Sequence, residues 1–199
     1  MLCNLITKKG IEDMKGLIVF GEKGSGKDTV AKLINEYSEK SVSFFNIGDL
    51  VRDMSCIFLA TDKWENKKRE FYVDTAIKLK EIDENFLSYY VLGKILDKFK
   101  KKSMKDIDNE QLIIVTGGRT YEDFEFWKKS GFKTLGVKCD EKVRIERLKS
   151  RDGYEQNSQD DLEKNTRKII DLCDFTVDNS GSFKDLTKEV TDFVVENGL

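Results

Sequence analysis

The stretch Leu17-Ile-Val-Phe-Gly-Glu-Lys-Gly-Ser-Gly-Lys-Asp-Thr29 joins a short apolar run to a glycine-rich loop and a lysine. Its spacing from Gly21 to Lys27 is G-x-x-x-x-G-K, and a helical pattern follows. Glycines let the backbone turn tightly, so that successive N–H groups can face one hollow, and a helix N-terminus adds positive potential there. The stretch therefore predicts a strand, a loop that binds the phosphates of a nucleotide, and a helix.

Two residues of this loop indicate the chemistry of the ligand. Lys27 would place its ammonium against the β- and γ-phosphates of a nucleoside triphosphate. Asp28 stands where Ser or Thr usually binds Mg²⁺, and a carboxylate can hold that ion directly or through water. We therefore expect ATP and Mg²⁺ as cofactors, with Asp28 as the metal ligand. The expected nucleotide-binding residues of the loop are Gly21, Glu22, Lys23, Gly24, Ser25, Gly26, Lys27, Asp28 and Thr29.

Composition limits the class of protein. The 199 residues, 39% of them hydrophobic, are enough for one domain with a real core. The formal charge of −2 gives no basic field for a nucleic-acid partner, and no apolar run approaches the roughly 18 residues of a membrane span. Four dispersed cysteines and the lack of a signal peptide favour a reduced, cytoplasmic protein. Residues 1–15 are expected to be an N-terminal extension, of which 1–13 are dispensable.

Apolar runs alternate with helical patterns along the chain, and this alternation predicts an α/β fold with a five-stranded parallel sheet covered on both faces. The expected strands are Leu17–Phe20, Val42–Phe45, Leu112–Thr116, Thr134–Lys138 and Phe175–Val177. The expected helices are Lys27–Glu39, Asp49–Leu59, Lys68–Glu81, Glu84–Lys101, Tyr121–Lys129, Glu141–Lys149, Asp160–Ile170 and Ser182–Glu196. The segment 49–108 is too long for one crossover and is expected to form a helical, acceptor-binding insert.

Ligands of such sheets bind beyond the carboxyl ends of the strands, so the residues after each strand are candidates for the site. Asp49 and Arg52 follow the second strand, and Arg119 follows the third after two glycines. The chain has 28 lysines but only seven arginines, whose planar fork suits phosphate. These residues are expected to bind substrate, although caps and surface pairs would give the same pattern.

Arg144, Arg147 and Arg151 recur at helical spacing before a polar stretch without a strong pattern. This favours a lid over 144–162 that closes arginines over a transferring phosphate, and the alternative is a solvated helix face. After the last strand, Asn179 and Gly181 are expected to contact a nucleobase, although any turn before a helix favours such residues.

With these residues in place, the chain resembles the nucleoside monophosphate kinase group of P-loop enzymes, most of all phage and bacterial deoxynucleoside monophosphate kinases. Ser25 to Asp28, the segment Lys68-Arg69-Glu70-Phe71 and the segment Ile82-Asp83-Glu84-Asn85-Phe86 carry the likeness. The resemblance implies a three-layer P-loop NTPase fold and adds Arg69 to the acceptor-binding residues. The family usually has Asp-Val-Arg where this chain has Gly117-Gly118-Arg119, which leaves Asp28 or Asp49 to supply the missing carboxylate.

The C-terminal third also resembles dephospho-coenzyme A kinase. The likeness is carried by Arg147-Leu148-x-x-Arg151-Asp152-Gly153 and by the segment from Asp174 to Ser182. That family normally has Gly-Lys-Ser in the phosphate loop, where this chain has Gly-Lys-Asp.

Both likenesses imply transfer of the γ-phosphoryl group of ATP, and they differ in the acceptor. A phosphate acceptor is already ionised at neutral pH and needs arginines, whereas a hydroxyl acceptor needs a base, for which this histidine-free chain offers Asp49. We favour a small phosphorylated acceptor, a (deoxy)nucleoside monophosphate. Dephospho-coenzyme A kinase activity and a non-catalytic nucleotide-binding regulator are the alternatives. The expected catalytic residues are Lys27, Arg119, Arg147 and Arg151, and the expected substrate-binding residues are Asp49, Arg52, Arg69 and Arg119.

Overall fold

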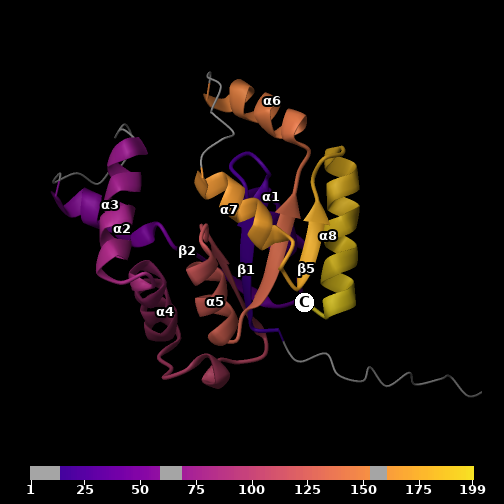
Figure 1. The fold of residues 1–199 in the computed structure, drawn as a ribbon. Coiled ribbons are helices and arrows are strands. Elements are labelled where there is room, and N and C mark those ends of the chain that lie inside the picture. Colours follow the sequence, from indigo (N-terminus) through magenta and orange to yellow (C-terminus); the bar gives the residue numbers. More distant parts are fainter. Residues whose placement is uncertain (1–13, 59–68, 153–160) are drawn as a thin grey trace, which may run out of the picture.

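The computed structural model describes residues 14–58, 69–152 and 161–199 of the chain (Figure 1). Met14 is only 5% exposed and packs in the hydrophobic core, so the packed domain has already begun at this residue. The expected dispensable extension over 1–13 lies outside the described residues, so it stays a prediction. Within the described parts of the chain, no helix is long and apolar enough to cross a bilayer.

The five expected strands are present and form one parallel sheet in the order β2-β3-β1-β4-β5. They are β1 (Gly16–Gly21), β2 (Ser41–Asn46), β3 (Gln111–Thr116), β4 (Lys133–Lys138) and β5 (Phe175–Asp178). The middle strands read as continuous apolar runs because helices cover both of their faces. This arrangement confirms the predicted α/β class and its parallel sheet.

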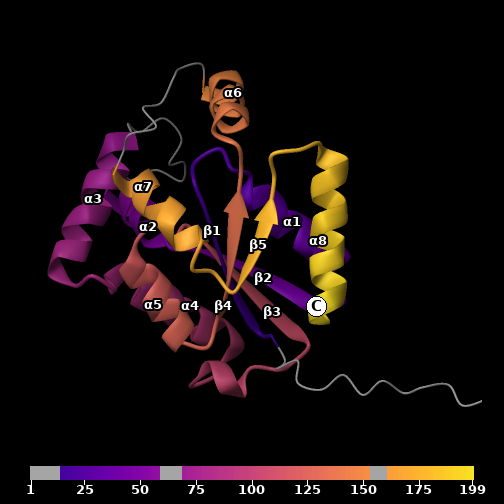
Figure 2. The same cartoon turned by 45° about the vertical axis from the view of Figure 1, so that its right-hand side comes forward.

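One face of the sheet is covered by α1 (Lys27–Tyr37) and α8 (Phe183–Asn197), which pack against each other (Figure 2). The opposite face carries α5 (Tyr121–Lys129), α7 (Asp161–Ile170) and α4 (Phe86–Phe99), a helix of the insert between β2 and β3. Two apolar clusters, one on each side of the sheet, hold the three layers together. On the α5 side, Trp127 is fully buried, and its ring meets the edge of Phe132 at a centroid distance of 4.6 Å.

The insert between β2 and β3 consists of α2 (Asp49–Phe58), α3 (Arg69–Ile82), α4 (Phe86–Phe99) and a short 3-10 turn, η1 (Met104–Asp106). Of these helices, α4 packs against β2, and its Val91 and Ile95 are fully buried. Figure 1 shows α2 and α3 on the β2 side of the molecule. The insert is therefore helical, as the sequence predicts, and its role in binding an acceptor stays a prediction.

The expected lid begins in α6 (Glu141–Asp152), which extends beyond the carboxyl ends of the strands in both views (Figures 1 and 2). The chain returns through α7 to the sheet. The segment 153–160 lies outside the described residues, so closure of the lid stays a prediction.

The order of the strands decides which residues meet. All five strands run in one direction, so their carboxyl ends lie along one edge of the sheet. The phosphate loop follows the central strand β1. The turn with Arg119 follows the neighbouring strand β3, and the segment with Asp49 and Arg52 follows β2 beyond it. On the other side of the loop lie the ends of β4 and β5, which lead to Cys139 and Asn179.

Candidate functional site

The glycine-rich loop leaves β1 and turns directly into α1. Gly26 is the N-cap of this helix and has φ 86, and no side chain caps it with a hydrogen bond. A Cβ at Gly26 would lie 2.1 Å from Nδ2 of Asn179, so only glycine fits this place. Gly26 has no side chain with which to cap α1, and the positive end of a helix in this position favours an anion, as the sequence predicts for a phosphate loop.

Ser25 marks the interior of the loop. It is 1% exposed, and its Oγ has no hydrogen-bond partner among the described residues. The backbone carbonyl of Ser25 accepts a buried hydrogen bond of 2.8 Å from Nδ2 of Asn179. Asn179 was expected to contact a nucleobase. Its side chain also links the loop to the end of β5 through this hydrogen bond. A buried hydroxyl without a partner costs free energy, and a polar ligand in the loop would remove that cost.

A second set of contacts holds the loop from the side of the expected lid. Glu22 is 6% exposed, and its carboxylate accepts hydrogen bonds of 2.9 and 3.4 Å from Nη2 and Nε of Arg167 in α7. Nη2 of Arg144 in α6 lies 3.8 Å from the same carboxylate, and Nη1 donates 3.1 Å to the carbonyl of Lys23. Both helices that flank the expected lid are therefore bonded to the phosphate loop.

Arg167 was not predicted to belong to the site, and Arg144 was expected only as one of the three arginines of the lid. Arg144 is 2% exposed, and its Nε and Nη2 donate no hydrogen bond in the described part of the chain. Its buried position shows that the solvated-face interpretation is wrong for this arginine. The signal in the sequence that could have identified Arg167 is the scarcity of arginine, since it is one of only seven.

Lys27, Asp28 and Thr29 form the first turn of α1. Lys27 is half-buried, whereas the side chain of Asp28 is exposed next to the loop. Mg²⁺ keeps several waters and takes only one or two carboxylates when phosphates supply further oxygens. The exposed oxygens of Asp28 beside an anion-binding loop therefore fit the requirements of Mg²⁺.

A cavity of about 200 Å³ adjoins the loop on the β5 side, between α1 and α8. It is lined by Gly26, Thr29, Arg147, Asn179, Phe183 and Leu186. Phe183 is 66% exposed, so its ring is accessible at the mouth of the cavity. An apolar wall, a guanidinium and an amide are suited to a flat polar ring such as a nucleobase.

Arg147 lies at this cavity. Its Nη2 donates to Oδ1 of Asn179 and its Nη1 to Sγ of Cys139, both at 3.4 Å. Burial raises the pKa of the Cys139 thiol above its usual value, although Arg147 opposes the shift. The neutral thiol can thus donate to the carbonyl of Asn179, 3.4 Å away. Cys56, Cys139 and Cys173 are all free.

Gly181 belongs to the turn before α8 but does not line the cavity. The next residue, Ser182, forms a capping box with Asp185, whose Oδ2 accepts from both the N–H and the hydroxyl of Ser182. These hydrogen bonds lower the pKa of the Asp185 carboxyl. The turn is thus fixed by helix capping, which was the alternative to nucleobase binding at this place.

On the other side of the loop, Asp49 and Arg52 form an ion pair within the first turns of α2. Oδ2 of Asp49 also accepts the N–H of Asn46 at 3.1 Å, so this carboxylate fixes the turn between β2 and α2 as well. A second cavity, of about 180 Å³, opens between α2 and α3 and is lined by Gly48, Val51, Arg52, Tyr72 and Ala76. A cation beside an apolar wall suits a ligand with an anionic end and an apolar body.

The β3 turn (Thr116–Thr120) explains the missing aspartate. Gly117 has φ 91, and a Cβ there would lie 2.8 Å from Oδ1 of Asn46. An aspartate at this position would be strained and would displace Asn46, whose side chain bonds Thr116 and the N–H of Gly48. The turn is therefore shaped to exclude the carboxylate that the resembling families carry.

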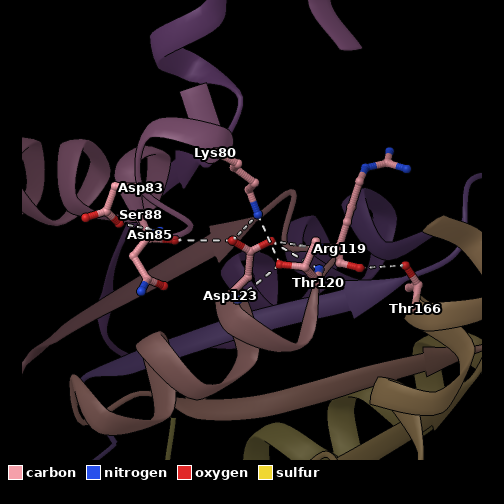
Figure 3. Close-up of polar contacts among 8 residues, drawn as sticks. All are labelled: Lys80, Asp83, Asn85, Ser88, Arg119, Thr120, Asp123 and Thr166. Carbon is pink, nitrogen blue, oxygen red and sulfur yellow. Dashed lines mark hydrogen bonds and ion pairs between the residues drawn. The ribbon is translucent and has the colours of Figure 1, made fainter. Parts of the chain in front are cut away.

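Hydrogen bonds to its backbone N–H and carbonyl fix the position of Arg119. Its N–H donates 3.0 Å to Oδ2 of Asp123, and its carbonyl accepts from Oγ1 of Thr166 at 3.5 Å. Figure 3 shows its guanidinium directed away from Asp123. Asp123 was not predicted as a functional residue, and only its place three residues after Thr120 hinted at a helix cap.

The remaining predicted residues, Arg69 and Arg151, lie in α3 and α6, and their side chains fall outside the described part of the structure. The sequence therefore predicted the residues of the loop and the strand ends, and the structure brings these into one row. The role of each residue stays a prediction.

The family model of an AAA domain, AAA_18, matches residues 17–171 of the chain. Among solved structures, the fold is similar to shikimate kinase from Aquifex aeolicus, at 20% identity over 92% of this chain and 97% of that chain, with a TM-score of 0.52. It is also similar to TT1252 from Thermus thermophilus, at 16% identity over 93% and 98%, with a TM-score of 0.59. Dephospho-CoA kinase from Campylobacter jejuni matches at 17% identity over 91% and 96%, with a TM-score of 0.52.

At these identities the likeness shows the fold alone, and it confirms the predicted α/β P-loop kinase fold. A search of curated proteins found no significant match.

Proposed function

The chain belongs to the AAA_18 family of AAA domains, and from this premise we propose that it is an ATP-dependent P-loop kinase. In this proposal the enzyme transfers the γ-phosphoryl group of ATP to a small phosphorylated metabolite. The acceptor class that fits the site best is a (deoxy)nucleoside monophosphate, which would give the diphosphate and ADP.

One observation carries the proposal: the phosphate loop lies between two cavities along the carboxyl edge of the sheet. The cavity beside Gly26 and Asn179 adjoins the loop on the β5 side. The cavity beside Arg52 lies on the β2 side, and the turn with Arg119 lies between it and the loop. A kinase needs this order, since the transferring phosphoryl group must pass from a donor held on one side to an acceptor held on the other.

On the donor side, the loop backbone and Lys27 would hold the triphosphate, and the cavity lined by Thr29, Arg147 and Phe183 would hold the nucleoside. The buried Ser25 hydroxyl without a partner supports a polar ligand here. Arg147 and Arg151 would stabilise charge on the transferring group when the lid closes.

On the acceptor side, Arg52 and Arg119 would bind the acceptor phosphate, joined by Arg69 from the insert. The apolar wall formed by Val51, Tyr72 and Ala76 would contact the body of the acceptor. A phosphate monoester is already ionised at neutral pH, so the reaction needs neutralisation of charge rather than a base. The described site supports this acceptor because Asp49 is already engaged with Arg52 and with the backbone of Asn46.

Asp28 is the residue that would hold Mg²⁺, with Asp49 as the alternative. When bound, Mg²⁺ neutralises charge on the phosphate oxygens of the donor. Gly117 cannot accommodate the carboxylate found in the resembling families, and Asp28 offers a carboxylate in the first turn of α1, directly after the loop.

A hydroxyl acceptor is the second candidate. The solved structures with this fold include proteins named as shikimate kinase and dephospho-CoA kinase, and Asp49 stands at the acceptor side as a possible base. A protein that binds a nucleotide without transferring phosphate is the third candidate.

A thermal-shift panel separates these candidates. The purified protein is heated with ATP, GTP, each common (d)NMP or dephospho-coenzyme A, alone and in donor–acceptor pairs, and ADP release is then measured for every pair. A ligand present at about 100 times its Kd stabilises the folded protein by about 2.7 kcal/mol, which is easily measured as a rise in melting temperature. We expect ATP with one (d)NMP to stabilise the protein most and to release ADP.

The matched control is Lys27→Ala, which should lose the shift with ATP and keep its melting temperature without ligand. Turnover with dephospho-coenzyme A but with no monophosphate would replace the proposed acceptor by the hydroxyl candidate. Stabilisation by a nucleotide without ADP release from any pair would contradict both the proposed monophosphate acceptor and dephospho-coenzyme A, and it would favour the non-catalytic candidate.

A further inference from the structure

Asp123 is a buried carboxylate that neither cavity uses. It lies in the first turn of α5, and its side chain is 2% exposed (Figure 3). Oδ1 forms an ion pair of 2.8 Å with Nζ of Lys80, and Oγ of Ser88 lies 3.5 Å away. Oδ2 accepts the N–H groups of Arg119 and Thr120 at 3.0 and 3.2 Å. A buried carboxylate with four partners is far better satisfied than an ordinary helix cap requires.

The second capping box of the chain gives the comparison. In α8, Asp185 caps through Ser182 alone, and both residues are exposed to solvent. In α5, the cap formed by Thr120 and Asp123 adds a lysine from a different element, and Nζ of Lys80 also donates 3.0 Å to Oγ1 of Thr120. Capping therefore accounts for the serine–aspartate pair in α8, but not for the lysine and the burial in α5.

The added contacts join the helical insert to the β3 turn. Lys80 comes from the last turn of α3, and Ser88 from the first turns of α4. The corner between these helices is fixed where Oδ1 of Asp83 accepts the N–H of Asn85 at 2.8 Å (Figure 3). Both helices thus contact the carboxylate that holds the turn.

The residue held by this carboxylate is Arg119. Its N–H is bound by Asp123, and its carbonyl accepts from Oγ1 of Thr166, which is 1% exposed in α7. The backbone of Arg119 is therefore fixed from α5 on one side and from α7 on the other. A side chain projects along the direction that its own backbone sets, so these contacts determine where the guanidinium can reach.

We propose that Asp123 and Lys80 are positioning residues for acceptor binding: their ion pair holds the β3 turn against α3 so that Arg119 faces the acceptor. The inference rests on the proposed function, and it adds that the insert and the acceptor-binding arginine are fixed relative to each other by this one buried pair. Misplacement of a substrate-binding group by about 1 Å can lower a rate by about 100-fold.

The test is Lys80→Met, with Lys128→Met as the matched control. Lys128 lies in α5, the helix that carries Asp123, and forms an ion pair of 3.2 Å with Asp174, a residue outside the β3 turn. Acceptor KM, donor KM and kcat are measured for both variants, together with amide hydrogen exchange of the segment from Thr116 to Tyr121. Lys80→Arg, which keeps the charge, serves as the rescue variant.

We expect Lys80→Met to raise acceptor KM by at least about tenfold, to leave donor KM within about twofold, and to speed exchange in the segment. The control variant should change neither KM value nor the exchange rate. Lys80→Arg should have an acceptor KM close to that of the wild type. If Lys80→Met does not fold, the double variant Lys80→Met/Asp123→Asn, which leaves no buried unpaired charge, is expected to give the same shift in acceptor KM.

Unchanged acceptor KM and unchanged exchange in an active Lys80→Met enzyme would overturn the inference, as would an equal rise of donor and acceptor KM. A wild-type protein that phosphorylates no acceptor would instead remove the proposed function. In that case faster exchange in Lys80→Met, with none in Lys128→Met, would still support the coupling, and its absence would refute it.

Discussion

The donor side and the acceptor side of the proposed site are built in different ways. On the donor side, side chains bind the backbone of the loop, as Asn179 does at Ser25 and Arg144 does at Lys23. On the acceptor side, carboxylates position arginines, as Asp49 does for Arg52 and Asp123 does for the backbone of Arg119.

This difference has a functional consequence. A loop backbone presents N–H groups that fit any triphosphate, so the donor side needs rigidity more than selectivity. The proposed acceptor side instead depends on two arginines, Arg52 at the start of the insert and Arg119 in the β3 turn. If the two sides act as proposed, substitutions on them should have separable kinetic effects.

The largest expected effect is that of Lys27→Ala. Its loss removes a charge that acts on both the ground state and the transition state of the donor, and we expect kcat to fall by at least about 10³-fold. Steady-state ADP release measures the effect, with Lys32→Ala, an exposed lysine of the same helix, as the control. A near-normal rate in Lys27→Ala would contradict the proposed role of the loop in binding the donor.

Arg119→Lys should have the next largest effect, and on the acceptor side only. Lysine keeps the charge but cannot form two parallel hydrogen bonds to a phosphate, so we expect kcat/KM for the acceptor to fall by about 10²-fold. Donor KM, measured at saturating acceptor, should stay near the wild-type value. Equal losses for both substrates would contradict a separate acceptor side.

Glu22→Gln should affect the donor side with a smaller magnitude. The neutral amide weakens the contacts of the loop to Arg167 and Arg144, so we expect donor KM to rise by about tenfold. Glu141→Gln is the control, because this half-exposed carboxylate contacts the same two arginines at 3.8 and 3.9 Å without belonging to the loop. A similar rise of donor KM in Glu141→Gln would mean that the two arginines of α6 and α7, rather than their contacts with the loop, determine donor binding.

Asp174→Asn should have the smallest effect and should touch neither side. Burial alone would raise the pKa of the Asp174 carboxyl, but hydrogen bonds from Thr134 and Lys128 outweigh it and lower the pKa. A lowered pKa stabilises the fold at neutral pH, and this stabilisation is lost as the pH falls through the folded-state pKa, below the usual value of 3.8.

We therefore expect Asp174→Asn to lose about 1 kcal/mol at pH 7, with unchanged kinetics. The difference from wild type should persist down to about pH 3.8, the ordinary pKa of this carboxyl, and shrink as the pH falls further through the lowered folded-state pKa. Urea unfolding at pH 7 and at a pH below 3.8 measures it, and a difference that grows on acidification would show that the sign is wrong.

Much of the fold was predictable from sequence because its signals are local. The five strands were each found within two residues at either end, and Tyr121–Lys129 was found with both bounds correct. The short turn η1 was missed, since three residues carry no periodicity. The phosphate loop was predictable for the same local reason, because its glycines, lysine and helix start are consecutive.

The partners of the site residues were not predictable. Asn179 bonds a loop residue 154 positions away, and Arg167 bonds Glu22 across 145 positions. Neither spacing leaves a periodic signal. The ion pair of Asp123 was not predictable either. Its spacing from Thr120 indicates only a helix cap, and the sequence does not show that Lys80 lies beside it.

The sequence alone predicted that a glycine-rich loop of the phosphate-binding type joins the first strand to a helix within a parallel α/β sheet, because glycine, lysine and apolar runs act on their own neighbours. The tertiary structure alone decided which of the seven arginines supports the loop and which faces a cavity. The order of the strands decides which charged side chains become neighbours. That order depends on how the whole chain packs its helices on the two apolar faces of the sheet.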